Sequence, residues 1–398
     1  MCTAREVFVS EEALGDPRCE ERVQRLLSRV ESGTLSVVPH RALAGAVNKA
    51  GTRRSLERGG LAGLGGEKRV VVLARLEDGS IAPGYRWDEL RSGGEQAKKH
   101  GVLCHSAIEI QSVVGCAFDC SYCPYSSFLC VHVDVEHFVE RVTALTRARK
   151  TQRLYKLNNR SDTLGLEPEY GLAPALVERF AELDGRYLML YSKGREVDAL
   201  TGLDHRGKTI ASFTLTPEPV AQLMERGAPA PKLRIQAIAK LAAAGYPIRA
   251  RFSPIVPIAG WEVAYADLIA QLTAVCRPEM LTLWTLSMVD YDTLERVVPL
   301  AALDRRSLAA AAASADTMRG KKGAPFPPNE RARIYGAIAA MMRDYSPGTA
   351  VSLCLETPDV WDLLGAQLVP RKGRQMLCNC GPVATPEALV AIRRACSA

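Results

Sequence analysis

The chain has 398 residues, of which 47% are hydrophobic, and its formal net charge of +7 is modest for this length. No apolar run is long enough to span a bilayer, and the charged N-terminus has no apolar signal core, so we expect a cytoplasmic protein with no membrane partner. Lys and Arg are spread along the chain rather than gathered in one basic stripe, which argues against a dedicated duplex-DNA protein and a stable DNA complex.

The N-terminal region mixes short strands and helices. REVFVS at 5–10 has the pattern of a strand, and CEERVQRLLSRVESG that of an amphipathic helix ending at Gly33. The glycine-rich stretch at 47–68 is typical of a loop. Its GLAGLGGE resembles a phosphate-binding loop, but no strand leads into it and a strand, KRVVVLARL, follows in place of a helix. We expect an α/β extension over residues 1–105.

From His105 onward, strands and helices alternate. The expected strands lie at 107–114, 153–158, 187–192, 209–216, 248–256 and 280–289, and the expected helices between them at 135–149, 172–183, 232–245 and 263–276. This alternation predicts a parallel sheet with covering helices, either open or as a partly closed barrel, over residues 106–300. Reactive residues of a barrel lie where its strands end.

The alternation stops near residue 300. Helices are expected at 307–320, 330–345 and 358–368, with a candidate strand, AVSLCLE, at 350–356. A tail with a short loop and a last helix follows. We expect residues 301–398 to form a mainly helical C-terminal region.

The stretch GCAFDCSYCPY at 115–125 brings three cysteines together, Cys116, Cys120 and Cys123. It follows the first strand of the alternating series. Thiolates suit zinc and iron–sulfur clusters, but a structural zinc site usually has paired CxxC units, and the chain has no second CxxC. A [4Fe–4S] cluster held by three cysteines leaves one iron open, so we favour that cluster over zinc or structural thiols.

This CxxxCxxC spacing resembles the signature of the radical S-adenosylmethionine superfamily. The resemblance implies that the amino and carboxylate groups of S-adenosylmethionine bind the open iron. An external one-electron reductant, flavodoxin or ferredoxin, would reduce the cluster, which then cleaves the cofactor to a 5′-deoxyadenosyl radical that takes a hydrogen atom from the substrate. The aromatic residue before the last cysteine, Tyr122, would pack on the adenine.

Further stretches, from about Arg5 to Thr357, resemble spore photoproduct lyase, a family that reverses a thymine dimer in DNA. They are RSDTLGLEPEYG, LYSKGREVDAL, GKTIASFTLTPEPVAQLMERGAP, KLAAAGYPIRARFSPIVPIAGWE and ERARIYG. The resemblance implies an α/β fold, a partial (β/α)6 TIM-type barrel with an N-terminal α/β extension and a C-terminal auxiliary-cluster region. It assigns Ser161, Asp162 and Lys193 to the methionyl and ribose groups of the cofactor.

One position departs from that family. Spore photoproduct lyases carry a cysteine just before the Ser-Asp pair, which returns a hydrogen atom to the product radical, and the aligned position here is Asn159. An amide N–H bond is too strong for that role, so we do not expect dimer reversal by the usual route. Tyr191, close to Lys193, is a candidate catalytic residue that relays a hydrogen atom, with an ordinary buried tyrosine as the alternative.

A second group of cysteines lies beyond the barrel region: Cys354 in VSLCLET, and Cys378 and Cys380 in MLCNCGP. These three fit an auxiliary [4Fe–4S] cluster, with buried thiols or a redox-active pair as the alternatives. The candidates for a fourth ligand are Cys130, Cys276 and Cys396. We expect Cys2, Cys19 and Cys104 to be structural.

Together these features predict a radical S-adenosylmethionine enzyme that abstracts hydrogen from a nucleoside or nucleotide. Sulfur from the auxiliary cluster would then be inserted, as in the sulfur-for-oxygen exchange of thionucleoside antibiotic biosynthesis. Two alternatives stay open. One is a redox-neutral pyrimidine-dimer lyase or DNA-repair-like enzyme, and the other a non-catalytic, metal-stabilised nucleic-acid-binding protein.

Overall fold

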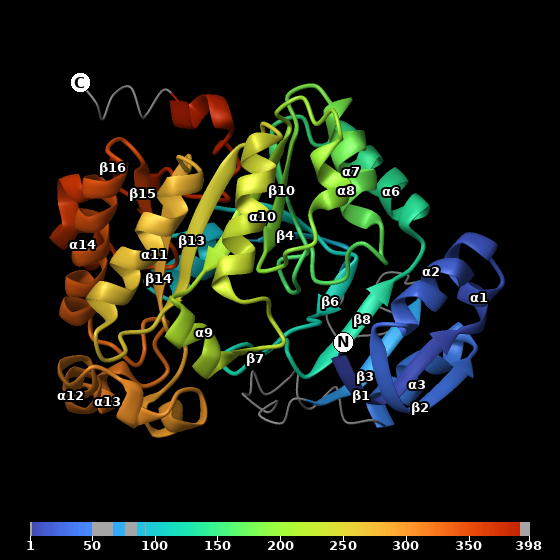
Figure 1. The fold of residues 1–398 in the computed structure, drawn as a ribbon, viewed down its shortest axis with the longest axis horizontal. Coiled ribbons are helices and arrows are strands. Elements are labelled where there is room, and N and C mark those ends of the chain that lie inside the picture. The colour runs from blue at the N-terminus through green and yellow to red at the C-terminus, as the bar shows by residue number, and fades with distance from the viewer. Residues whose placement is uncertain (1, 50–66, 76–85, 92, 391–398) are drawn as a thin grey trace.

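The fold is that of a computed structural model, in which residues 2–49, 67–75, 86–91 and 93–390 are described. Most of the glycine-rich stretch at 47–68 lies outside these residues. The described strands form two main sheets, one of eight strands and one of five. Figure 1 shows the N-terminal strands and helices as a unit beside the larger sheet and its helices.

The larger sheet carries five of the six strands predicted from the alternating pattern and the first half of the sixth. The strand predicted at 107–114 divides into a strand at 107–110 in this sheet and a second short strand at 113–115 in the smaller sheet. Seven neighbouring strands are parallel, and β4 (Asp88–Arg91) pairs antiparallel at one edge. In spatial order from β4 the parallel strands are β5 (Ala107–Ile110), β9 (Leu154–Leu157), β10 (Tyr187–Ser192), β11 (Thr209–Leu215), β13 (Ile248–Ile255), β14 (Met280–Thr285) and β15 (Ala350–Leu353). The sheet is open, because β4 and β15 are its two edges. β15 comes from the candidate strand AVSLCLE and extends the sheet beyond the six predicted strands.

Helices follow the strands along the chain and cover one face of the sheet. They include α6 (Val135–Ala148), α7 (Leu172–Ala181), α10 (Pro231–Ala243), α11 (Trp261–Val275) and α14 (Pro328–Tyr345). Each predicted helix of the alternating series is present. Strand alternation explains the layering, since on β13 the buried apolar residues Ala250 and Phe252 alternate with Arg249 and Arg251, which point to the opposite face. The inside of the partial barrel is therefore lined by polar side chains.

The smaller sheet has the order β2-β1-β3-β8-β6. Its strands are β1 (Cys2–Ser10), β2 (Val30–Val38), β3 (Glu67–Ala74), β8 (Phe128–His132) and β6 (Val113–Gly115). The predicted helix at 19–33 is partly wrong, because α2 (Pro17–Leu27) ends earlier. Residues from Val30 onward instead pair in parallel with β1, from Cys2↔Val30 to Ser10↔Val38, and this ladder replaces further helical turns.

The remaining elements surround these sheets. They are α1 (Glu11–Leu14), α3 (His40–Lys49), α5 (Gly93–Lys99), β7 (Asp119–Cys120), α8 (Asp198–Thr201), α9 (Glu218–Met224), β12 (Glu225–Arg226), α12 (Arg305–Ala313), α13 (Ala315–Met318), α15 (Pro358–Leu364), β16 (Arg371–Lys372), β17 (Gln375–Met376) and the 3-10 turns η1 (Tyr291–Arg296), η2 (Leu300–Ala302) and η3 (Gly365–Gln367). Across the described part of the chain, no helix combines the length and apolar character needed to cross a membrane.

The C-terminal tail runs back into the barrel. The guanidinium of Arg249 on β13 donates hydrogen bonds to the carbonyl oxygens of Asn379 and Ala384. Asn379 in turn donates from Nδ2 to Ser212 Oγ of β11 at 3.0 Å. These buried contacts place the tail cysteines inside the partial barrel rather than on the surface of the molecule.

Candidate functional site

The first cysteine loop is positioned by a glycine. Gly115 ends β6 with φ of +87°, and a Cβ there would lie 2.1 Å from the carbonyl oxygen of Phe128, so the close approach of the two strands requires glycine. Cys116 follows, and its N–H donates to the carbonyl oxygen of Tyr125 at 2.9 Å. Cys120 lies in β7, which pairs with β12, and the N–H of Cys123 donates to the carbonyl oxygen of Cys120 at 3.0 Å.

The three thiols of this loop share one buried environment. Burial raises the pKa of Cys116 well above its ordinary value, that of Cys120 to about 12, and that of Cys123. Each of the three lies within electrostatic reach of at least one of the others. Three neighbouring thiol donors fit an iron–sulfur cluster, which binds them as thiolates.

Within the described residues, no three His, Cys, Asp or Glu side chains are arranged around a single metal ion. A cubane cluster makes a different demand, because it binds each thiolate through a separate iron and so keeps the sulfur atoms further apart than one ion does.

A buried charge network lies against this loop, centred on Glu225. Its carboxylate accepts from Arg234 at 2.5 Å, from the Tyr122 hydroxyl at 2.8 Å and from Thr216 Oγ1 at 3.0 Å, and lies 3.1 Å from the ammonium of Lys193. Burial alone would raise the pKa of Glu225, but Lys193 and Arg234 lower it to about 2. Burial opposes the charge of Lys193, and Glu225 outweighs it and raises the Lys193 pKa.

This network holds Lys193 beside the cysteine loop. The ammonium of Lys193 and the guanidinium of Arg234 face the carboxylate of Glu225, and Lys193 lies within electrostatic reach of the Cys120 thiol. Lys193 also lies 4.7 Å from the centre of the Tyr122 ring and donates to its hydroxyl. The structure thus brings together Tyr122 and Lys193, both predicted to hold the cofactor. Glu225 and Arg234 were missed from the sequence, although Glu225 lies in the quoted stretch GKTIASFTLTPEPVAQLMERGAP.

Asp162 connects two of the strand-end loops. Its carboxylate accepts from the Ser192 hydroxyl at 2.6 Å, from the N–H of Lys193 at 2.5 Å and from the N–H of Leu164 at 3.0 Å. Burial raises its pKa against these hydrogen bonds. Ser161 is half-buried beside it in the turn after β9. Asp162 therefore ties the turn after β9 to the residue that carries the Lys193 ammonium.

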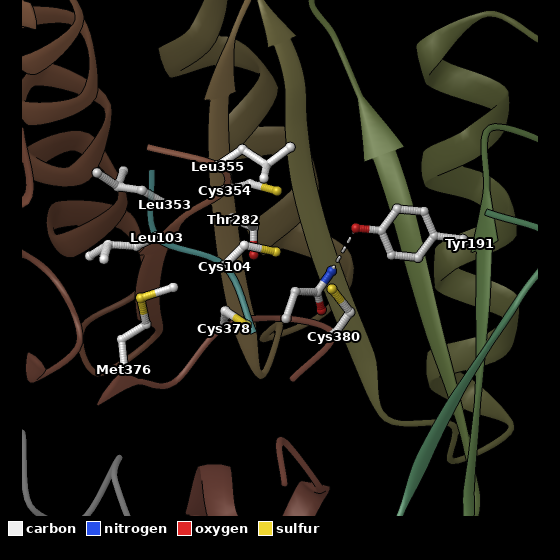
Figure 2. A pocket seen from close by; sticks show the side chains of 11 residues that line it. Leu103, Cys104, Tyr191, Thr282, Leu353, Cys354, Leu355, Met376, Cys378 and Cys380 are labelled. Carbon is white, nitrogen blue, oxygen red and sulfur yellow. Dashed lines mark hydrogen bonds between the residues drawn. The ribbon is translucent and has the colours of Figure 1, made fainter. Parts of the chain in front are cut away.

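The second group of cysteines gathers in one pocket. Cys354 follows β15, and Cys378 and Cys380 come from the tail that Arg249 holds in the barrel. All three line the same pocket, together with Cys104, which precedes β5 (Figure 2). The pKa of Cys378 is raised well above its ordinary value, first by a hydrogen bond with Cys380 and then by burial, with Cys104 and Cys354 adding to the effect.

Cys104, which was expected to be structural, lies among the tail cysteines. It joins the pocket because the chain before β5 pairs with the segment after β15. The N–H of Leu103 donates to the carbonyl oxygen of Glu356 at 2.7 Å, and His105 Nε2 lies 2.6 Å from the carbonyl oxygen of Met376. These contacts join segments about 250 residues apart, so no local spacing in the sequence indicates them.

The three other candidates for a fourth ligand lie elsewhere or outside the described residues. Cys130 is buried in β8 of the smaller sheet, and Cys276 follows α11 on the helical side of the barrel. Cys396 lies outside the described residues. Cys104 takes their place in the pocket.

Tyr191 lies between the two cysteine sites. It lines the tail pocket, and its hydroxyl accepts from Asn379 Nδ2 at 3.2 Å (Figure 2). It also precedes Lys193 by two residues, so both side chains point into the barrel, with Cα atoms about 7 Å apart in an extended chain. Burial raises the Tyr191 pKa above its ordinary value, which keeps the phenol protonated. Asn159 is half-buried in the neighbouring turn after β9.

Comparison with known proteins identifies relatives of this region. Residues 104–295 match the family model described as spore photoproduct lyase. The spore photoproduct lyase of Bacillus subtilis (strain 168) is 27% identical over 172 residues, covering 42% of this chain and 50% of that protein. The spore photoproduct lyase of Geobacillus sp. (strain Y412MC61) is 26% identical over 177 residues, covering 41% and 50%. The chain thus spans about half the length of the curated relatives it matches.

Solved structures extend the likeness. A spore photoproduct lyase mutant with bound AdoMet and dinucleoside spore photoproduct superposes with a TM-score of 0.60 at 18% sequence identity, covering 88% of this chain and 98% of that chain. Spore photoproduct lyase complexed with dinucleoside spore photoproduct gives the same values. At this identity the match shows the fold alone, and it confirms the predicted mixed α/β architecture with a partial barrel.

Proposed function

We propose that this chain, which resembles the spore photoproduct lyases of the radical S-adenosylmethionine superfamily, abstracts a hydrogen atom from a nucleoside or nucleotide and inserts sulfur there, in a sulfur-for-oxygen exchange. The carbon radical would form a C–S bond with a sulfide of a second cluster, whose iron takes up one electron, and the replaced C–O bond would break with its oxygen leaving as water. One observation carries this proposal. Cys104, Cys354, Cys378 and Cys380 line one pocket inside the barrel. Tyr191 lines the same pocket, and Lys193, two residues later, lies beside the Cys116–Cys123 loop. A pocket of four thiols at that place fits a second cluster that supplies sulfur.

The first cluster would be held by Cys116, Cys120 and Cys123. When bound, it supplies one electron to S-adenosylmethionine and so gives the 5′-deoxyadenosyl radical. The chain's own residues fix the surroundings. Glu225 keeps Lys193 charged and in place, where its ammonium binds the carboxylate of the cofactor. Tyr122, held by its hydrogen bond to Glu225, offers its ring to the adenine.

Ser161 and Asp162, the other residues assigned to the cofactor, lie in a turn that hydrogen bonds hold in place. Asp162 holds the turn after β9, which contains Ser161, against the loop after β10. The hydroxyl of Ser161 is of the right kind to bind the ribose or methionyl group. An external flavodoxin or ferredoxin would supply the electron.

A lyase-like reaction is a second candidate, and a separate observation favours it. Asn159 replaces the family's hydrogen-donating cysteine, but Tyr191 and the thiol of Cys380 both lie at the tail pocket. Either of these X–H groups is a replacement donor for a product radical. In this candidate the tail thiols return a hydrogen atom and no sulfur enters the product.

The test measures iron and acid-labile sulfide per chain after anaerobic reconstitution. The intact protein is compared with a variant in which Cys354, Cys378 and Cys380 are all alanine. We expect about eight irons in the intact protein and about four in the variant, the contents of two cubane clusters and one. About four irons in both proteins would remove the sulfur donor and leave the lyase-like candidate.

A second measurement addresses the radical chemistry itself. Both proteins are reduced with dithionite in the presence of S-adenosylmethionine, and 5′-deoxyadenosine is quantified. We expect it from both, because the variant keeps the Cys116–Cys123 loop. A non-catalytic nucleic-acid-binding protein would form none, and that result would overturn the proposed function.

A further inference from the structure

One buried arginine differs from the others. Five arginines are buried in the described part of the chain, and four have a carboxylate partner. The pairs are Arg22–Glu136 at 2.8 Å, Arg234–Glu225 at 2.5 Å, Arg249–Glu279 at 3.0 Å and Arg331–Glu356 at 2.7 Å. Arg251 is 8% exposed, and no described residue forms a hydrogen bond or ion pair with it. Its Nε is a buried donor without a partner.

The position of Arg251 is inside the barrel. It lies mid-strand on β13, two residues after Arg249, and its guanidinium stacks 4.3 Å from the centre of the Tyr191 ring. Two further buried polar atoms lack a partner at the pocket that Tyr191 lines: Thr282 Oγ1, on the strand position paired with Arg251, and Asn379 Oδ1. The three orphaned atoms thus belong to residues grouped around one tyrosine.

A buried guanidinium without an anion is costly, and here the Nε donor is removed from water and left unpaired. Stacking on an aromatic ring satisfies only the flat face and leaves the planar edge, which matches two oxygens of a phosphate or carboxylate. The cost disappears when an oxyanion binds at that edge.

Lys156 places a second cation at the same ring, with Nζ 3.9 Å from its centre. It is buried, and its neighbour across the β5–β9 ladder is the buried Glu109. The charge of Lys156 therefore has a carboxylate nearby, whereas Arg251 forms no ion pair with a described residue. The positive charge at Tyr191 exceeds what the neighbouring carboxylate balances.

We propose that Arg251 binds a negatively charged group of the substrate, a phosphate or a carboxylate. Thr282 and Asn379 form hydrogen bonds with polar groups of the substrate next to that anion. The substrate is then an anionic nucleotide rather than a neutral nucleoside. This inference rests on the proposed function. It also places the substrate at Tyr191, between the loop of Cys116 and the tail pocket.

The test is equilibrium dialysis of reconstituted holoenzyme with S-adenosylmethionine present. The probes are the four common nucleosides, their 5′-monophosphates and their 5′-carboxylates. We expect at least one base whose charged form binds about tenfold to a hundredfold more tightly than its nucleoside, the loss expected for one charged hydrogen-bonding pair. Comparison of the 5′-monophosphates with the 5′-carboxylates identifies which oxyanion binds. Arg251→Gln should reduce the preference to within about twofold, and Arg251→Lys to an intermediate value.

Arg153→Gln is the matched control. Arg153 also lies over a tyrosine of β10, with Cζ 5.6 Å from the centre of the Tyr187 ring, but its Nε donates to the carbonyl oxygen of Gly185. This variant should keep the full preference for the charged ligand. Circular dichroism and a thermal melt establish that each variant is folded, and if Arg251→Gln is not, Arg251→Lys carries the comparison.

Four results would overturn the inference. Wild-type protein that binds the charged and neutral forms equally has no oxyanion site. Arg251→Gln protein that keeps the preference places that site elsewhere. If Arg251→Gln instead loses iron and keeps the preference, the guanidinium balances the charge of the auxiliary cluster. The proposed function fails separately, through the absence of 5′-deoxyadenosine from wild-type protein. If neither charged nor neutral ligands bind, the nucleotide substrate and this inference are both wrong.

Discussion

The two cysteine sites are built in opposite ways. The loop of Cys116, Cys120 and Cys123 is local in sequence, and a buried ion network around Glu225 adjoins it. The tail pocket collects Cys104, Cys354, Cys378 and Cys380 from three distant segments, and its polar neighbours are the phenol of Tyr191, the amide of Asn379 and the hydroxyl of Thr282. A local motif reveals the first site from sequence, whereas the second exists only once the tail has docked.

The largest expected effect is the loss of 5′-deoxyadenosine formation when the first cysteine site alone is removed. Replacing Cys116, Cys120 and Cys123 together with alanine should reduce 5′-deoxyadenosine formation to the level of a no-enzyme control, because no protein ligands of the first cluster are left. About four irons per chain should stay in the tail pocket. The assay is chromatographic quantification of 5′-deoxyadenosine after dithionite reduction. Undiminished formation in this variant would place the radical chemistry outside the loop.

The next effect concerns the ion network. Glu225→Gln leaves Lys193 and Arg234 buried without a carboxylate, so the free energy of unfolding should fall by about 3–5 kcal/mol. Denaturant unfolding measures it. Glu279→Gln, which breaks the pair with Arg249 at a less buried carboxylate, is the matched control and should cost less. Equal losses in the two variants would contradict a special role for Glu225.

The same network predicts a pH dependence. The pKa of Glu225 falls from 4.5 to about 2 on folding, so its carboxylate stabilises the folded state above pH 4.5. That contribution is lost as the pH falls from 4.5 toward 2. Unfolding curves of wild type and Glu225→Gln should therefore converge on acidification within this window. A constant difference in unfolding free energy between the two proteins across this pH window would show that the Glu225 carboxylate is not the source of the stabilisation.

A smaller effect sharpens the tail site. Cys104→Ala should lower the iron content of the reconstituted protein as much as Cys378→Ala does, because both thiols line one pocket. Cys276→Ala is the control, since that thiol lies after α11 on the helical side and should leave iron unchanged. Normal iron content in Cys104→Ala would return Cys104 to a structural role.

The smallest effect concerns Tyr191. Tyr191→Phe removes one hydrogen bond from Asn379 Nδ2, which should cost about 1 kcal/mol of unfolding free energy. The ring stays, so the stacking of Arg251 is kept. If the hydroxyl relays a hydrogen atom, product should fall while 5′-deoxyadenosine continues to form. Unchanged product formation would leave the tyrosine a purely packing residue.

Sequence reasoning located what local pattern encodes. The barrel strands follow from alternating apolar segments, whereas Lys193 and Tyr122 were assigned from the resemblance to spore photoproduct lyase and to the radical S-adenosylmethionine superfamily. It did not place Cys104 in the tail pocket or Glu225 beside Tyr122 and Lys193, because these neighbours are distant in sequence. It also extended the helix at 19–33 too far, since pairing of Val30 with Cys2 lies outside any local window. Non-local pairing explains these three differences.

The docking of the tail bears on how the molecule is made. The guanidinium of Arg249 donates a hydrogen bond to the carbonyl oxygen of Ala384, which lies 135 positions later in the chain. During synthesis the first cysteine loop is therefore complete long before the tail that closes the second pocket has left the ribosome. Under the proposed function, the cluster of the loop would be loaded first and that of the tail pocket last. A chain that ended before residue 378 would keep Cys116, Cys120 and Cys123 but lack Cys378 and Cys380.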